Sequence, residues 1–63
     1  MEKAVIIIDE RENFTYFLGV SLKTGKEIFC EEFSSEYFYS NEDGIKAGLE
    51  EQYGIDIVNE III

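Results

Sequence analysis

Carboxylates are the most abundant side chains in this 63-residue chain that could do chemistry, with fourteen Asp and Glu against five Lys and Arg. A metal-dependent reaction requires several carboxylates that converge on the same ions. The run Asn41-Glu42-Asp43-Gly44 contains residue types found in calcium loops, but it lacks the ligand spacing and the closing Glu of such a loop. We therefore interpret this run as the start of a helix, and we expect neither a metal ion nor a cofactor.

Cys30 is the single thiol of the chain. A cysteine nucleophile needs a neighbouring base, and the sequence contains no His to provide one. The same absence argues against a zinc site, and one cysteine cannot close an internal disulfide. We interpret Cys30 as a small apolar residue of a strand. Because glycine-rich phosphate loops, Ser-His-Asp sets and metal-binding cysteine pairs are also missing, we expect a protein without enzymatic activity.

The net charge of −9 restricts the classes of partner. Nucleic-acid binding depends on Lys and Arg that neutralise phosphates, and here one Arg and four Lys are dispersed along the chain. We expect no direct binding to DNA, RNA or an anionic membrane. A basic protein partner is favoured, since complementary fields accelerate the encounter. The alternative, that the acids only keep a small protein soluble, stays open.

Six acids are predicted to line an outer strand and the start of a helix as one negative surface: Glu27, Glu31, Glu32, Glu36, Glu42 and Asp43. In composition the chain is short, strongly acidic and rich in aromatic residues. It resembles in this respect the small phage and plasmid inhibitors that imitate the phosphate backbone. The resemblance implies a viral type of inhibitor that occupies the nucleic-acid site of a basic protein.

Three strands are predicted in the first half of the chain. Ala4 to Ile8 is a β-branched run without alternation, which is typical of a central strand. Residues 14–22 alternate as a second strand, with Phe14, Tyr16, Leu18, Val20 and Leu22 on its main apolar face. Residues 23–26 form a hairpin turn in which Gly25 takes a positive φ, and residues 27–33 return as a third strand. The three strands form an antiparallel meander.

One helix is predicted over residues 42–53, with Ser40 or alternatively Asn41 as its N-cap and Gly54 as its C-terminal stop. Its buried stripe is expected to consist of Ile45, Leu49 and Tyr53. A close approach of the helix to the sheet would explain Gly48. The segment 34–40 is expected to be irregular or briefly extended.

Residues 55–63 are predicted as a regularly alternating fourth strand. A strand–helix–strand crossover places it parallel to the first strand, so the chain forms one α+β domain over residues 1–63 with sheet order 3-2-1-4. This arrangement resembles the opening half of a ribonuclease H-like fold. The resemblance implies a metal-binding carboxylate at Asp9, with Glu50 or Glu51 as a second, and a metal-dependent nuclease is the third functional alternative.

One helix covers only one side of such a sheet, and apolar surface is left over on the other side, where Phe17 is expected. Two alternatives stay open. Either this face is an interface of a homodimer or with a partner, or the segment 34–40 folds across it. The predicted apolar interface consists of Phe17, Tyr37, Phe38 and Tyr39.

No leader peptide and no transmembrane run is evident, and a single cysteine fits a reducing compartment, so we expect a cytoplasmic protein. The predicted function is a non-enzymatic acidic protein-binding module. A structural or assembly domain that forms a homo-oligomer is the second alternative.

Overall fold

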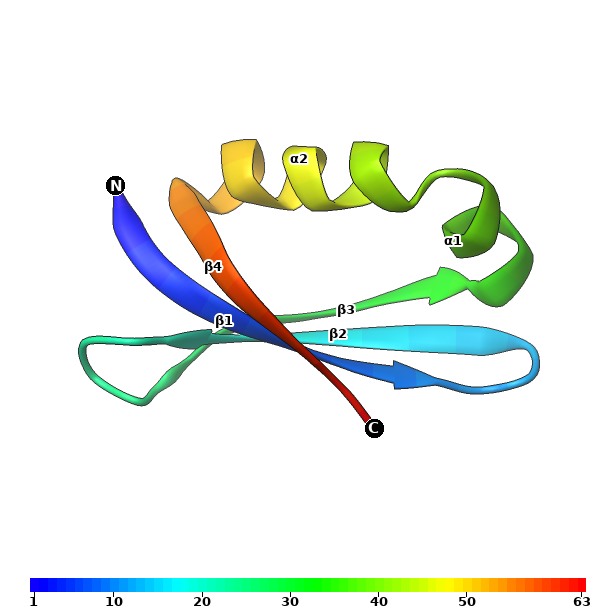
Figure 1. Cartoon of the computed structure of the whole chain (residues 1–63), viewed down its shortest axis with the longest axis horizontal. Helices are drawn as coiled ribbons and strands as arrows, with labels where there is room; N and C mark the ends of the chain where they lie inside the picture. The colour runs from blue at the N-terminus through cyan, green and yellow to red at the C-terminus, as the bar shows by residue number, and fades with distance from the viewer.

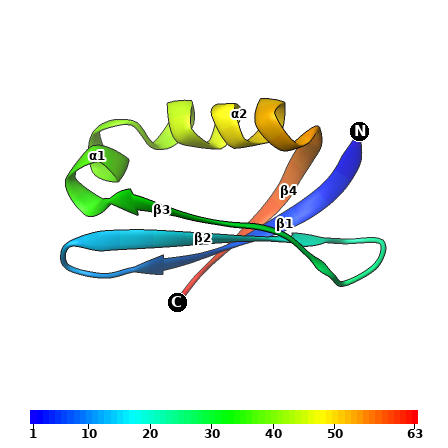
Figure 2. The same cartoon turned by 180° about the vertical axis from the view of Figure 1, so that it is seen from behind.

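The computed structural model describes all residues, 1–63, as a four-stranded sheet with two helices. The elements in chain order are β1 (Glu2–Glu10), β2 (Phe14–Ser21), β3 (Glu27–Ser34), α1 (Ser35–Ser40), α2 (Glu42–Tyr53) and β4 (Ile55–Ile62). The strand order is β3-β2-β1-β4, with β1 parallel to β4 and the other pairs antiparallel. Both helices lie on the same side of the sheet (Figures 1 and 2). The predicted α+β class and the order 3-2-1-4 are confirmed.

The turn between β2 and β3 forms where the sequence predicts it. Gly25 has a φ of 72°, and its N–H donates to the carbonyl of Ser21 at 2.8 Å. The pairing of β2 with β3 then shifts between Gly19 and Val20, which leaves Ile28 as the extra residue of a bulge. Turn and bulge together set the register of the hairpin.

The segment before α2 is a short helix, so the expectation of an irregular or extended piece is wrong. Ser34 provides the N-cap of α1, because its hydroxyl accepts a hydrogen bond from the N–H of Tyr37 at 3.1 Å. Ser35 at the start of α1 is buried; its hydroxyl donates to the carbonyl of Arg11 at 2.6 Å and accepts from the hydroxyl of Thr15 at 2.9 Å. The aromatic run favours a strand locally, but a capped helical turn lets Phe38 enter the core.

The bounds of α2 agree with the prediction, and Gly54 ends the helix with a φ of 64°. The N-cap position belongs to Asn41 rather than Ser40, and no side chain caps the helix there. Ile45 and Leu49 are buried and Tyr53 is half-buried, as the stripe predicts. The explanation for Gly48 is wrong, since a Cβ added there would meet nothing within 4 Å.

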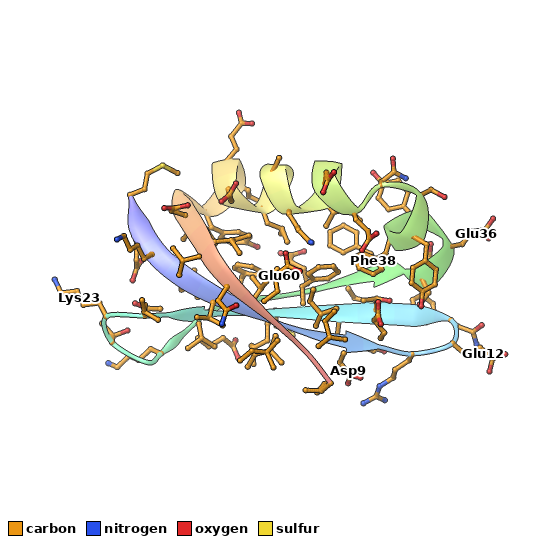
Figure 3. All side chains as sticks on the ribbon, in the orientation of Figure 1. Asp9, Glu12, Lys23, Glu36, Phe38 and Glu60 are labelled. Carbon is orange, nitrogen blue, oxygen red and sulfur yellow. The ribbon has the colours of Figure 1, made fainter.

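The helices cover the face of β2 opposite to the predicted one. Phe17 is fully buried between Phe33 and Phe38, with ring centroids 5.5 Å and 5.2 Å away. Figure 3 shows Phe38 in the space between the helices and the sheet. The covered face of β2 otherwise carries the small residues Thr15, Gly19 and Ser21, and Gly19 leaves room for the ring of Phe29 from β3. The expectation that Phe17 lies on an uncovered face is therefore wrong.

The alternation of β4 is interrupted, contrary to the regular pattern expected from the sequence. Its pairing with β1 shifts between Ala4 and Val5, so that Val58 is an extra residue. Beyond the shift, Glu60 lies on the helix side, where its carboxylate accepts a hydrogen bond from Lys46 at 2.7 Å (Figure 3). Ile61 consequently faces away from the helices.

The core lies between the helices and the sheet. It contains nine buried apolar residues: Ala4, Ile6, Ile8, Phe17, Phe29, Phe38, Ile45, Leu49 and Ile55. Neither helix has the length and apolar content needed to cross a membrane.

Candidate functional site

Unpaired carboxylates gather at the end of the molecule where β1 turns into β2 and β3 runs into α1. The start of α1 is joined to this turn, because the N–H of Ser35 donates to the carbonyl of Asn13 at 3.0 Å. Figure 3 shows Glu12 and Glu36 at this end and Lys23 at the opposite end. We call this region the acidic end and define it by six exposed residues: Glu10, Glu12, Glu32, Glu36, Glu42 and Asp43.

The acidic end keeps its charge uncompensated. Only two of the fourteen carboxylates form ion pairs in the chain, Asp9 with Arg11 at 2.9 Å and Glu60 with Lys46. The basic residues nearest to the acidic end are Arg11, which is paired with Asp9, and Lys46, which is paired with Glu60. The resulting negative field is directed at solvent, where it can attract a cationic surface.

Four of the six acids that the sequence selected lie at this end: Glu32 near the end of β3, Glu36 on α1, and Glu42 and Asp43 at the start of α2. Glu27 lies at the other end of β3, next to the hairpin turn. Glu31 points to the helix side and accepts a hydrogen bond from the hydroxyl of Tyr53. The sequence selection missed Glu10 and Glu12, although the predicted meander already places the first turn beside the end of the third strand.

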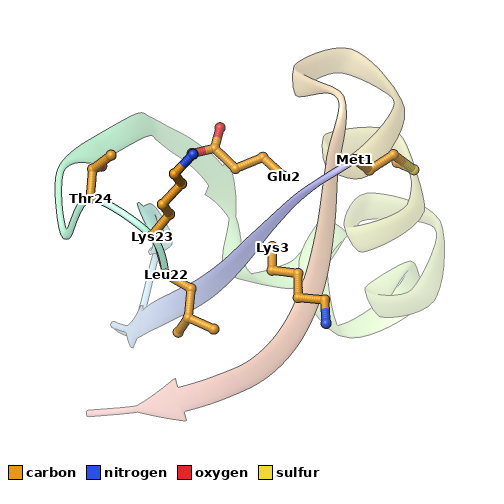
Figure 4. Close-up of a pocket in the computed structure, with 6 residues that line it drawn as sticks. All are labelled: Met1, Glu2, Lys3, Leu22, Lys23 and Thr24. Atoms are coloured by element: carbon orange, nitrogen blue, oxygen red, sulfur yellow. The ribbon is translucent and has the colours of Figure 1, made fainter.

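The opposite end of the molecule carries most of the remaining basic residues. Lys3, Lys23 and Lys26 are exposed there and form no ion pair. Two of them line an open hollow together with Met1, Glu2, Leu22 and Thr24 (Figure 4). Glu2, Glu27, Glu51 and Asp56 also lie toward this end, so positive and negative charges are nearly balanced there, and the excess negative charge falls at the acidic end.

The carboxylates considered as metal ligands do not meet. Asp9 is engaged by Arg11, and a carboxylate oxygen of Glu50 accepts a hydrogen bond from the backbone N–H of Ile57 at 2.9 Å. No three His, Cys, Asp or Glu side chains come together in a group that could hold a metal ion. Cys30, expected as an apolar strand residue, is an exposed free thiol on β3.

Hydrogen bonds to neighbouring carboxylates alter the proton affinities of Arg11 and Tyr53. The hydrogen bond from Arg11 to Asp9, and the attraction between their charges, raise the pKa of the guanidinium above its ordinary value. The hydrogen bond between the Tyr53 hydroxyl and Glu31 raises the pKa of this phenol, and removal from water and the negative charge of Glu31 act in the same direction.

This shift predicts a loss of stability at high pH. The folded protein holds the Tyr53 proton more tightly than the unfolded chain does, so the stabilisation is complete below the ordinary pKa of 10.0 and disappears as the pH rises through the raised value. Glu31→Gln should lower the pKa of Tyr53, as measured by tyrosinate absorbance. Glu32→Gln is the matched control, because Glu32 forms no hydrogen bond with a tyrosine. Equal titrations of both variants would contradict the assigned partner.

The distinctive features of the geometry are the acidic end and the uncovered face of the sheet. Comparisons with protein-family models, with curated proteins and with solved structures found no match to this chain.

Proposed function

We propose that this chain is a non-enzymatic protein-binding module whose acidic end docks on a basic surface of another protein. The observation that supports the proposal is the gathering of exposed carboxylates without cationic partners at one end, while three of the five basic residues lie at the other. Such an arrangement attracts a positively charged partner from a distance and orients it during approach.

The partner chemistry that fits is a surface rich in Arg or Lys, such as a nucleic-acid-handling protein uses to hold phosphates. Carboxylates at the acidic end would then stand in for phosphate groups and block that surface. The free thiol of Cys30 fits a reducing compartment, so the proposed activity belongs to the cytoplasm.

The test is a pair of triple variants that carry the same change in net charge. In the first variant, Glu10, Glu12 and Glu36 at the acidic end become Gln. In the second, Glu27, Glu51 and Asp56, which are exposed elsewhere, become Gln or Asn. The probe is a short arginine-rich peptide, and its association rate and affinity are measured at low and at physiological salt.

The acidic-end variant should bind the peptide about tenfold more weakly, because each exposed ion pair contributes about 0.5 kcal/mol. Its association should also be slower and less sensitive to salt. The second variant should lose clearly less. Equal losses in the two variants would show that the acids act only through net charge, and the proposal would then fail.

The phosphate imitation is tested with the unchanged protein. Duplex DNA and the acidic end should compete for the same peptide, so addition of DNA should displace the protein. Simultaneous binding of both would restrict the proposal to a basic partner with a separate nucleic-acid site.

A further inference from the structure

The side of the sheet that faces away from the helices is mainly apolar across β2, β1 and β4. Ala4, Ile6 and Ile8 of β1 are buried beneath the helices, and the residues between them point to the other side. We call this other side the open face and define it by Val5, Ile7, Tyr16, Leu18, Val20 and Ile61. Neither α1 nor α2 lies on it (Figures 1 and 2).

The register aligns these side chains in rows. Ile7 pairs with Leu18 on one side and with Ile61 on the other, and Leu18 pairs with Cys30. This central row crosses the sheet from β4 to β3 without a charged residue. Charged residues of this face lie around the central row: Glu27 and Glu32 on the edge strand β3, and Lys3 and Asp9 near the two ends of β1, with Arg11 over the ring of Tyr16.

We propose that the open face is covered by a second copy of this chain, which forms a homodimer with a two-sheet core. The first reason for a second copy as the partner is the area of the open face. Four strands of eight residues span about 26 Å by about 19 Å, or roughly 500 Å² per copy, so two copies bury about 1,000 Å². A buried area of about 1,000 Å² is the lower limit of a specific interface. The limit is reached only when the partner covers the whole face, and a second identical sheet has the size to do so.

The second reason is the small core of the single chain. Nine buried apolar residues stabilise 63 residues, and the one cysteine cannot provide an internal disulfide. Domains of this size usually need a disulfide, a metal or self-association in addition to their core. A dimer through the open face adds the six apolar residues of each copy to a shared core.

The third reason is that the charges of the open face permit this pairing in one orientation. A two-fold axis along the strands, between β1 and β2, places β3 of one copy over β4 of the other. Glu27 then lies over Asn59 of the second copy, and Cys30 over Ile61 of the second copy. An axis across the strands would instead place Glu27 over Glu32 of the second copy, where like charges repel.

The test measures mass and thiol protection in the full chain. Light scattering at micromolar concentration should give about twice the chain mass of 7.3 kDa. Leu18→Glu introduces a charge into the central row and should return the mass to that of one chain. The matched control is Gln52→Glu, which adds the same charge at an exposed position on α2 and should leave the dimer intact.

Cys30 provides a second readout that does not depend on how well the Leu18 variant folds. In the unchanged protein, a thiol reagent should modify Cys30 about tenfold more slowly at high than at low protein concentration, because the second copy covers it. A single-chain mass at all concentrations, together with a constant reaction rate of Cys30, overturns the proposal and leaves the face to a different protein. The result is independent of the acidic end, since Leu18, Gln52 and Cys30 lie outside it.

Discussion

Replacing Phe17 with Ala should lower the free energy of unfolding by about 3–5 kcal/mol, the cost of removing a large aromatic side chain from a packed core. Phe17 is fully buried and forms edge-on contacts with Phe33 and Phe38. A chain of 63 residues has a total stability of only about 3–9 kcal/mol. The variant should therefore be largely unfolded in mild denaturant, as measured by urea titration followed by circular dichroism.

Phe14→Ala is the matched control for this prediction. The same atoms are removed from the same strand, but Phe14 is 47% exposed and points away from the helices. Its loss should cost about 1 kcal/mol, the average for a point substitution. Equal losses at the two positions would mean that the helices do not select the Phe17 face of β2.

Gly19→Ala should destabilise the protein by about 1–3 kcal/mol, because the added methyl overpacks the core. A Cβ at Gly19 would lie 2.6 Å from Cδ2 of Phe29, and this ring has little freedom to move because it stacks on Tyr53 at a centroid distance of 4.5 Å. The change in the urea midpoint measures the loss. Combined with Phe29→Leu, which shortens the side chain above the glycine, the substitution should cost less than it does alone.

Gly48→Ala makes the same chemical change with the opposite expected sign. Nothing lies within 4 Å of a Cβ at this position, and the residue is in the interior of α2. The variant should be about 0.5–1 kcal/mol more stable, since alanine loses less backbone freedom than glycine in a helix. A stabilising Gly19→Ala would show that the ring of Phe29 does not rest on β2 as described.

The sequence alone determined the elements that local rules control. The β-branched run predicts the central strand β1, and Gly25 and Gly54 mark a turn and a helix end that need a positive φ. Strand order then followed from two general rules, since hairpins place neighbours antiparallel and a crossover helix makes β4 parallel to β1. These features depend on residues close in sequence or on chirality, so they did not require knowledge of the packing.

Which face of the sheet is covered was decided only by the tertiary structure. Period-two alternation separates the two faces of β2, but it does not say which one the helices contact. The face of β2 that contains Leu18 has more apolar residues, and the sequence therefore suggested that the helices cover it. The helices instead cover the opposite face, where Gly19 makes room for the ring of Phe29 and Phe17 contacts Phe38. The covered face is the one on which side chains distant in sequence fit together in volume. The same fit, with Phe38 in the core, accounts for the helix α1 after β3.

The acidic end was likewise only partly predictable. Charge and composition indicated a negative surface, but the members of that surface depend on which turns lie side by side. Glu12 and Glu36 are far apart in sequence. They lie at the same end of the molecule because α1 is hydrogen-bonded to the turn between β1 and β2. Glu31, chosen from its position in an acidic strand, is instead held by Tyr53, because the bulge and the pleat direct it beneath the helix. The composition therefore predicted that the surface is negatively charged, whereas its position depends on the three-dimensional packing.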